Sequence, residues 1–496
     1  MKVEKTSQNK SIIRNSFFLF VTQMLVSIFS LASSIIIARV IGPYVTGQYN
    51  YLIWIASTFT ALGTLGLPNA LIKFIAEYSE NSNNNVAQKI AGNLLLIVSL
   101  LGFGMAIILV ILTYFHLFPN NTSQIFFYLI ALTIPLTTLS TSIEAAFSGN
   151  RKYSSTLSAN VIVSPIMFVT LLIILFYMHS LQGLVTYYVM SSILSLAVHA
   201  ILAKKNIEIS FIKLPDDIAR RVWHYSLIVS GILLLDQIVW NRSEVIFLGH
   251  YSTPEQVAFY SLSYSLTNSV MTLLPGSIIG ALMPHVAALQ GLKNIKGIVS
   301  SYQKASKYVG LIVAFIIGGG IALATPFVAT IYGMHYYQMI PVFRILVFTA
   351  GWGTIGSVAM TILYGTNQQK IILKIGVILS IINIILDFTL IPLFGAVGAS
   401  IANGVAQVTG SLLGIYILSR RGIAFPVVTY IKIFGITIIS CLSIFLMSSI
   451  FEINNLFTLI IGGMLYSLLF GLLIYVTKLL KVEEVPGLNT LLGKFN

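Results

Sequence analysis

The sequence predicts an all-α polytopic membrane protein with about 14 transmembrane helices. Hydrophobic residues make up 57% of its 496 residues, whereas charged residues make up only 8%. Soluble domains carry about 25% charged residues, so this composition excludes a soluble enzyme. The apolar segments are also each near the ~20 residues that a helix needs to cross a bilayer.

Polar residues separate the predicted spans along the chain. In order, the spans cover residues 14–40, 47–74, 88–115, 123–148, 155–178, 182–204, 222–249, 256–284, 305–332, 339–364, 370–392, 396–419, 427–450 and 454–479. The polar, basic stretch at residues 1–13 has no signal-peptide cleavage site after a short apolar core. We therefore interpret the apolar run that follows it as a retained first span.

Lysine and arginine gather in alternate loops between these spans. Such loops include the pairs at residues 151–152, 204–205 and 420–421, and the intervening loops contain almost none. Because positive residues favour the cytoplasmic side, we expect both termini in the cytoplasm. The net charge of +14 is therefore a topology signal, and without a dense basic patch it does not indicate nucleic acid as a partner.

Short similarities between distant segments predict an internal repeat of six spans. Residues 146–152 resemble residues 363–369, and residues 42–49 resemble residues 249–260 apart from an insertion. An even number of spans separates the copies, so both have the same orientation, as in transporters with parallel repeats around a central cavity. The predicted domains are an N-lobe at 1–206 (helices 1–6), a cytoplasmic linker at 207–221 with an amphipathic segment, a C-lobe at 222–421 (helices 7–12), and helices 13 and 14 with a cytoplasmic tail at 422–496.

The seventh span contains an unusually polar run at residues 235–245. Helical spacing places five of these side chains on one broad face: Asp236, Gln237, Trp240, Asn241 and Glu244. An ionised side chain that faces lipid costs at least about 2.5–3.5 kcal/mol, so we expect this face to meet a protein interior or a wet cavity. Arg242 points away from it, so either the helix unwinds locally or Arg242 serves a second surface.

Other ionisable residues lie in other predicted spans. Arg39 ends the first span on the outer side, Arg344 lies early in the tenth, and snorkelling to the interface is the alternative to a site role for both. Asp387 is near the outer end of the eleventh span, where a cap or an ion pair is the alternative. Glu144 lies near the cytoplasmic end of the fourth, where pairing with Arg151 or Lys152 would explain it. Cavity arginines favour an anionic head group, most naturally phosphate, and nearby acids favour a coupling cation or charge balance.

Proline and glycine within the spans predict mechanical features. Pro68 in the second span and Pro275 and Pro284 in the eighth occupy corresponding places in the two repeats, which fits two equivalent bundles that can bend, although structural packing is the commoner role of such residues. The three glycines at residues 318–320 predict close helix packing or a bend in the ninth span.

The sequence contains no catalytic or metal-binding pattern. Its seven histidines are scattered, Cys441 is its only cysteine, and it has neither a phosphate-binding glycine loop nor a nucleophile elbow. We therefore expect no enzyme activity, no metal and no cofactor.

Three segments resemble a known family. Residues 38–49, with the sequence ARVIGPYVTGQY, resemble the AR-x-LGP-x-x-x-G-x-Y pattern between the first two helices of polysaccharide-type flippases. Residues 66–77 are similar to the end of their second helix, and residues 236–249 with Tyr260 and Ser261 to the start of their second half. The chain thus resembles the Wzx-like branch of the multidrug/oligosaccharidyl-lipid/polysaccharide exporter superfamily, which includes O-antigen, capsule and exopolysaccharide translocases.

The resemblance implies a flippase that moves an isoprenoid-diphosphate-linked oligosaccharide across the cytoplasmic (inner) membrane by alternating access. It implies a set of residues that meet the diphosphate and sugars, for which our candidates are Arg39, Arg242, Arg344, Trp240 and Asn241. Candidates for coupling groups or charge partners are Asp236, Glu244 and Asp387. The implied partners are this substrate and the membrane, with other polysaccharide assembly proteins as a further class.

Two alternatives stay open at this point. A cation-coupled multidrug or small-molecule antiporter of the same superfamily shares the repeat plan, but it would have a compact cavity. A membrane glycosyl-polymerase or ligase is the enzyme alternative, and it would need a large extracytoplasmic loop. Every predicted outer loop in this sequence is short.

Overall fold

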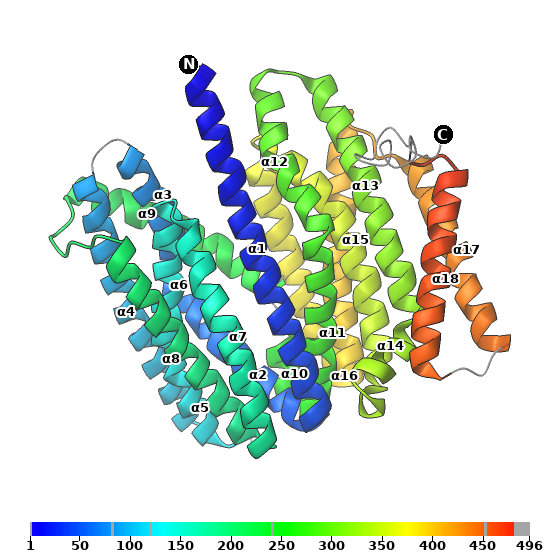
Figure 1. Cartoon of the computed structure of the whole chain (residues 1–496), viewed down its shortest axis with the longest axis horizontal. Coiled ribbons are helices and arrows are strands. Elements are labelled where there is room, and N and C mark those ends of the chain that lie inside the picture. Colours follow the sequence, from blue (N-terminus) through cyan, green and yellow to red (C-terminus); the bar gives the residue numbers. More distant parts are fainter. Residues whose placement is uncertain (1, 81–83, 120, 240–242, 451–453, 481–496) are drawn as a thin grey trace. The chain divides into compact units, whose positions relative to one another are not determined.

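A computed structural model of the whole chain describes residues 2–80, 84–119, 121–239, 243–450 and 454–480. These residues form helices joined by short turns, and no strand occurs among them (Figure 1). Contacts divide the chain into two compact units, Met1–Ser261 and Leu262–Asn496. The all-α class predicted from the sequence is confirmed.

The first unit is built around α6, which packs between α4 and α8, while α1 packs along α7. Its helices are α1 (Lys2–Ile41), α2 (Pro43–Thr64), α3 (Leu67–Glu80), α4 (Asn84–Tyr114), α5 (Gln124–Ala131), α6 (Thr133–Gly149), α7 (Tyr153–Tyr177), α8 (Leu181–Asn206), α9 (Asp216–Val239) and α10 (Glu244–Tyr251). Contacts therefore group α9 and α10 with the first unit, although the sequence repeat assigns them to the C-lobe. The predicted lobe boundaries remain a proposal about the repeat.

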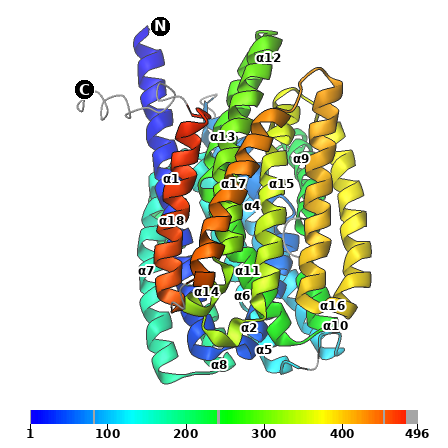
Figure 2. The same cartoon turned by 90° about the vertical axis from the view of Figure 1, so that its right-hand side faces the viewer.

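The second unit is built around α15, which packs against α13 and α16, and Figure 2 shows α17 and α18 beside this group. After α11 (Pro254–Leu273), which crosses the unit boundary, its helices are α12 (Pro275–Gly291), α13 (Ile295–Ala322), α14 (Ala324–Ile331), the 3₁₀ turn η1 (Met334–Tyr336), α15 (Met339–Gly365), α16 (Gln369–Arg420), α17 (Val427–Ile450) and α18 (Asn455–Val476). α17 contacts both α13 and α18, so the last two helices extend this unit.

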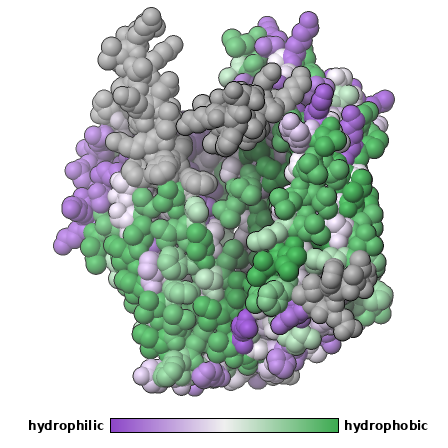
Figure 3. Space-filling model, turned by 45° about the vertical axis from the view of Figure 1, so that its right-hand side comes forward, coloured by the Kyte–Doolittle hydropathy of each residue, from purple (hydrophilic) through white to green (hydrophobic). Residues whose placement is uncertain are grey.

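Ten described helices are long and apolar enough to span a membrane, or up to twelve if each bent pair is one span. α16 counts once in that number, although the non-helical backbone of Gly395 (φ 54°, ψ −129°) divides it into two arms. Adding its second arm accounts for every predicted span except the seventh, part of which, residues 240–242, lies outside the described residues. Figure 3 shows a mostly hydrophobic face with hydrophilic residues gathered toward its upper and lower ends. The chain is therefore a multi-pass membrane protein, as predicted.

The structure contains a bend near each of these proline positions. The axes of α2 and α3 differ by 45°, and those of α11 and α12 differ by 48°. Between α2 and α3, Gly66 has a φ of +67°, and a Cβ there would lie 2.9 Å from the Ser226 carbonyl oxygen of α9. In the second unit, Pro275 begins α12, where its missing N–H removes no helical hydrogen bond.

The glycines at residues 318–320 serve packing rather than bending. α13 runs through them without interruption, and a Cβ on Gly318 would lie 2.4 Å from the Tyr466 hydroxyl oxygen of α18. That hydroxyl donates to the Phe315 carbonyl oxygen at 3.0 Å. Small residues let membrane helices approach closely, so Gly318 and Gly319 make room for Tyr466 of α18, whereas Gly320 makes room for Val347 of α15.

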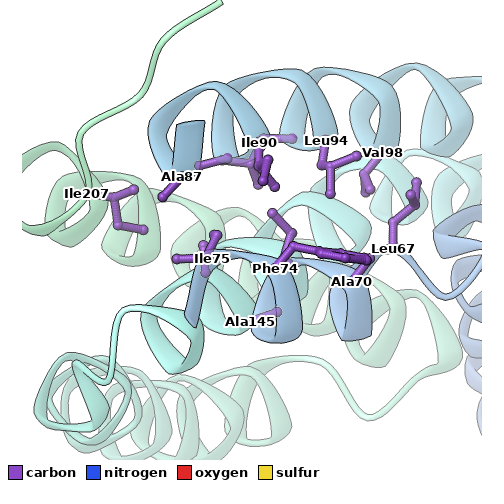
Figure 4. Close-up of a cluster of buried hydrophobic side chains, with 14 of the residues drawn as sticks. Leu67, Ala70, Phe74, Ile75, Ala87, Ile90, Leu94, Val98, Ala145 and Ile207 are labelled. Carbon is purple, nitrogen blue, oxygen red and sulfur yellow. The ribbon is translucent and has the colours of Figure 1, made fainter. Parts of the chain in front are cut away.

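The linker between α8 and α9 packs against other helices of the first unit. Ile207 belongs to a buried cluster formed by α3, α4 and α6 (Figure 4), and the Ser210 amide donates to the Gln88 carbonyl oxygen at 3.1 Å. Residues 207–215 are not helical, whereas α9 begins at Asp216, so the predicted amphipathic segment is helical only in its last part. The hydrogen bond from Ser210, and one from the Asn93 side chain of α4 to the Ile212 carbonyl oxygen, compete with helix formation here. Phe211 nevertheless remains 69% exposed.

The start of α9 is fixed to the end of α3 by an ion pair. Arg221 donates from its two terminal nitrogens to the two carboxylate oxygens of Glu77, at 2.7 and 3.1 Å. These hydrogen bonds raise the pKa of Arg221. Beside them, the Lys73 ammonium lies 4.0 Å from the centre of the Tyr225 ring. The linker and α9 are therefore held to the bent helix α3.

Candidate functional site

The predicted polar run at residues 235–245 falls on α9, α10 and the residues between them. α9 ends at Val239, and α10 begins at Glu244. Trp240, Asn241 and Arg242 lie outside the described residues, so their predicted contact with substrate stays a prediction. Asp236 is part of α9, but its side chain also lies outside the described part of the structure.

Glu244 is completely buried in the first turn of α10. Free N–H groups and the helix dipole stabilise a carboxylate at this position. α10 packs against α2, so Glu244 contributes to the interior of the first unit. Because no surface of Glu244 is exposed, its position favours the role of charge partner over contact with a large substrate.

Arg344 lies near the start of α15 with an exposed side chain. Its Nε donates to the Ile321 carbonyl oxygen at 3.2 Å, and Nη2 donates to Oγ1 of Thr325 at 3.3 Å. Ile321 is one residue from the end of α13, where free carbonyl groups and the helix dipole favour a cation. A guanidinium has five N–H donors, so these two contacts fix its position and leave donors for a ligand.

Arg344 lines a cavity of about 890 Å³ within the second unit. The wall comes from α13, α15, α17 and the starts of α14 and α18, and most of its side chains are apolar, among them Phe348, Ile438, Leu442 and Phe445. Cys441 lines the same cavity. A fixed guanidinium beside apolar walls suits an anionic group that is attached to a hydrophobic chain.

A second cavity, of about 420 Å³, lies within the same unit. Gly319 and Gly320 of α13 line it, together with residues of α11, α15 and α18 such as Val270, Val347 and Leu459. No charged residue is among its described lining residues. It therefore offers apolar volume without a recognition group for an anion.

Arg39 lies in the first unit, in the last turn of α1, and its side chain is exposed. This position fits both of the roles predicted for it, namely snorkelling and substrate contact. Arg39 and Arg344 belong to different units, and their convergence on one cavity stays a prediction.

Asp387 is completely buried in the first arm of α16. Nδ2 of Asn383, one turn earlier and also completely buried, donates to Oδ2 of Asp387 at 3.2 Å. On the second arm, Nε2 of Gln407 donates to Oδ1 of the buried Asn403 at 2.5 Å. Each pair has the i, i+4 spacing that places two side chains on the same stripe of a helix.

The way the two arms pack places these two hydrogen-bonded pairs at similar heights along the helices. Leu379 packs against Gly410, where a Cβ would lie 2.7 Å from its Cδ1, and the Leu390 carbonyl packs against Gly398. Asn383 and Asp387 continue the Leu379 stripe toward the kink, and Asn403 and Gln407 lie between Gly398 and Gly410 on the facing arm. The result is a buried polar layer, which we define as Asn383, Asp387, Asn403 and Gln407.

Sequence reasoning identified Asp387 but missed the three amides of this polar layer. The i, i+4 spacing of amide and carboxylate groups in two otherwise apolar spans was a signal that could have found them. How the two arms pack against each other cannot be predicted from either span alone. A buried ionisable group within a membrane span is by default a candidate functional residue.

Residues 12–290 match the model of a family described as polysaccharide biosynthesis protein. The probable flippase AglR of Haloferax volcanii is 26% identical over 205 residues, which is 40% of this chain and 42%, less than half, of AglR. An uncharacterized membrane protein of Methanocaldococcus jannaschii is 22% identical over 456 residues, 87% of this chain and 89% of that protein.

Solved structures with a similar fold are transporters. The lipid II flippase MurJ, in an inward closed conformation, matches with a TM-score of 0.73 at 16% identity, over 94% of this chain and 99% of MurJ. An inward-facing multidrug transporter of the MATE family matches with a TM-score of 0.68 at 15% identity, over 83% of this chain and 98% of that one. At these identities the similarity concerns the fold alone.

Proposed function

We propose, because the chain belongs to the polysaccharide biosynthesis protein family, that it is a flippase for an isoprenoid-diphosphate-linked oligosaccharide. Family and fold make it a flippase-like transporter of the multidrug/oligosaccharidyl-lipid/polysaccharide exporter superfamily. We further propose that the substrate moves from the cytoplasmic to the outer leaflet of the cytoplasmic membrane, and that transport proceeds by alternating access. Both chain termini then lie in the cytoplasm, as the loop charges indicate.

The position of Arg344 is the observation that carries this proposal. Its guanidinium is fixed by Ile321 and Thr325 at the edge of a cavity of about 890 Å³ with mostly apolar walls. A diphosphate offers several anionic oxygens to the remaining donors, and guanidinium–phosphate pairs are often bidentate. The apolar walls suit the hydrophobic part of the same molecule. Arg39, Arg242, Trp240 and Asn241 remain our further candidates for contacts with the diphosphate and the sugars.

The buried polar layer around Asp387 supports a coupling role. Asp387 and its amide neighbours offer oxygen atoms in an apolar surrounding, which suits a proton or a small cation. A ligand shifts a two-state equilibrium only through different affinity for the two states. We therefore propose that cation occupancy at Asp387 changes the balance between inward and outward states, with Asp236 and Glu244 as further charge partners.

A cation-coupled antiporter of organic cations is the second candidate function, because the MATE transporter shares the fold. The charge of Arg344 argues against it, since a fixed guanidinium repels a cationic drug in a cavity of low dielectric constant. The two functions therefore predict opposite charge preferences for the transported molecule.

The experiment is reconstitution of the purified full chain into vesicles that contain a lipid-linked oligosaccharide. A sugar-specific enzyme or lectin outside the vesicles then measures how much substrate reaches the outer leaflet. We expect faster redistribution than in protein-free vesicles, and no uptake or efflux of a cationic dye. An unchanged leaflet distribution, or dye transport in its place, would overturn the proposed function.

A further inference from the structure

Large apolar side chains are exposed on the linker between α8 and α9. Phe211 is 69% exposed and the neighbouring Ile212 is 62% exposed, whereas Ile207 and Leu214 at the two ends of the segment are buried. Figure 1 shows this linker, in green, at an edge of the first unit. Apolar residues that are exposed singly are common on protein surfaces, but an adjacent pair held outward by the fold indicates an interaction surface.

Contacts with α4 hold the linker in this conformation. The Ser210 amide donates to the Gln88 carbonyl oxygen at 3.1 Å. Two residues further along the linker, the Ile212 carbonyl oxygen accepts from Nδ2 of Asn93 at 2.9 Å. Gly92 lies between these two contacts on α4, and a Cβ there would collide with the Ser210 carbonyl oxygen. The backbone of the linker therefore lies directly on α4, and the fold holds its exposed side chains outward.

The linker covers the side of α4 that faces lipid. α4 is long and apolar enough to span a membrane. Beyond Gly92, one stripe of this helix consists of large apolar residues that are each at least half exposed, namely Leu96, Leu100, Phe103 and Ile107. In a spanning helix such a stripe contacts hydrocarbon. Gly92 belongs to the same stripe, so the linker lies on the lipid-facing side of α4, at its predicted cytoplasmic end.

The linker also lies at the depth of a membrane interface. The third predicted span begins at residue 88, and Asn93 is five residues further along α4. At about 1.5 Å per residue, Asn93 lies roughly 8 Å inside the predicted boundary. Interfacial segments bury their apolar side chains about 5–10 Å into the boundary between head groups and acyl chains. Because Asn93 holds Ile212, the exposed pair Phe211 and Ile212 lies at this level.

Basic side chains flank this apolar pair in the chain. Three of them are exposed and form no ion pair with a described residue, namely Lys204 and Lys205 at the end of α8 and Arg220 near the start of α9. Lys152, which the sequence suggested as a partner of Glu144, instead donates from Nζ to the Asn206 carbonyl oxygen, where the linker begins. The cytoplasmic leaflet contains anionic lipids, so these cations match its charge.

The acids of the same region have other roles. The Gln88 side chain donates to the Glu208 carboxylate. Asp216 pairs with Lys213 at 3.2 Å. Asp216 and Asp217 also lie in the first turn of α9, where carboxylates stabilise the helix dipole. The three exposed cations therefore remain for an anionic ligand.

We propose that the linker is a phospholipid-binding surface, in which Phe211 and Ile212 insert into the cytoplasmic leaflet while Lys204, Lys205 and Arg220 bind anionic head groups. Two signals of this kind, apolar insertion and basic charge, together give stable contact with a membrane surface. The linker runs directly into α9, so the bound lipid holds the start of this helix at the interface. The inference goes beyond the proposed transport function, because it requires only the predicted cytoplasmic orientation of the linker.

The depth of residue 211 in a bilayer tests the insertion. The full chain carries Phe211→Cys and Cys441→Ala, bears a nitroxide at residue 211, and is reconstituted into vesicles of phosphatidylcholine and phosphatidylglycerol. Phe211 is exposed, so the label leaves the packing of the linker intact. Collisions of the nitroxide with oxygen, which concentrates in lipid, are compared with its collisions with a water-soluble nickel complex.

Residue 292, labelled in the same way through Leu292→Cys, is the matched control. Leu292 is also strongly exposed, but it lies eight residues past the end of the eighth predicted span, which is roughly 12 Å outside the membrane. We expect the ratio of oxygen to nickel collisions to be several-fold higher at residue 211 than at residue 292. Equal, water-like ratios at both positions would overturn the lipid contact in favour of a protein partner.

The same label measures the preference for anionic lipid. Each basic residue near an anionic membrane surface strengthens association by about fivefold. Compared with pure phosphatidylcholine, added phosphatidylglycerol should therefore raise the collision ratio at residue 211. The combined variant Lys204→Gln, Lys205→Gln and Arg220→Gln should lose this rise.

Three exposed lysines of the second unit provide the matched control for charge. The combined variant Lys293→Gln, Lys296→Gln and Lys304→Gln removes the same number of positive charges and should retain the response of residue 211 to phosphatidylglycerol. If the chain with all of its basic residues gives the same ratio in both lipid compositions, the assignment of an anionic head group is wrong.

Discussion

Nε of Arg344 on α15 donates to the backbone carbonyl oxygen of Ile321, in the last turn of α13, at 3.2 Å. The acceptor is a main-chain atom at a helix end, so a change of neighbouring side chains does not remove it. A second donor reaches Thr325 at the start of α14. Arg344 is therefore a cation with a fixed direction at the edge of the larger cavity.

Substitution of Arg344 tests whether this fixed direction serves substrate binding. Charge-assisted hydrogen bonds contribute about 1.5–3 kcal/mol each, so Arg344→Ala should weaken binding of the lipid-linked oligosaccharide by roughly 10- to 100-fold. Arg344→Lys should recover little, because an ammonium lacks the planar fork of donors. Binding to the detergent-solubilised protein measures both. Arg421→Ala is the matched control, since Arg421 donates to Gln368 outside this cavity. Equal affinity in Arg344→Ala would remove Arg344 from the site.

The only cysteine of the chain reports on the same cavity. Cys441 lines the wall with Arg344, so an occupied cavity should slow its reaction with a small maleimide several-fold. The wild-type protein is sufficient, with mass spectrometry as the readout and Cys441→Ala as the blank. Protection should disappear in Arg344→Ala. Labelling at the same rate with and without substrate would place the substrate elsewhere.

The sequence predicted much of the fold because the relevant signals are local. Apolar length and loop charge indicated the spans, and proline indicated the bends at Gly66 and Pro275, which the structure contains. It was less informative for the linker at 207–215, where apolar periodicity favoured an amphipathic helix. Hydrogen bonds to α4 hold that segment in a non-helical conformation. Because α4 is distant in the sequence, these bonds leave no periodic pattern in the linker residues.

The candidate sites depend more strongly on contacts between distant residues. Hydropathy identified Arg344, Asp387 and Glu144 because each is an ionisable group in an apolar run. It missed Asn403, whose hydrogen bond with Gln407 lies within one arm, and the level of that pair relative to Asn383 and Asp387 follows only from the register of the two arms. Neutral side chains in apolar spans are common, so polarity alone does not single them out.

Gly66 should be the residue on which the bend between α2 and α3 depends. An alanine there would adopt a left-handed backbone conformation that costs about 1–2 kcal/mol, and its Cβ would also press on the Ser226 carbonyl oxygen at 2.9 Å. Gly422 is the matched control, because it has a φ of +81°, ends α16 in the same left-handed manner, and has nothing within 4 Å of an added Cβ. Thermal unfolding in detergent should therefore show a larger loss for Gly66→Ala than for Gly422→Ala. Equal losses would mean that the backbone conformation alone matters and that the contact with α9 does not.

Asp387→Asn tests the coupling role of the buried polar layer. Asparagine has nearly the same shape as aspartate and can still accept a hydrogen bond from Asn383, so we expect the protein to fold and insert normally. It lacks the negative charge that would hold a coupling cation or a proton. Transport driven by a cation gradient should therefore fall at least about tenfold, which corresponds to about 1.4 kcal/mol of lost differential affinity.

A second aspartate provides the control that separates the location of the Asp387 charge from the simple loss of one negative charge. Asp216 is 88% exposed in its pair with Lys213 on the surface, so Asp216→Asn removes a carboxylate without touching the buried layer. It should transport at the wild-type rate under every gradient. For Asp387→Asn, the slow exchange that needs no gradient should persist, because the arginine candidates for substrate binding are unchanged. If Asp387→Asn retains its full response to proton and sodium gradients, the layer is structural and coupling resides elsewhere in the chain.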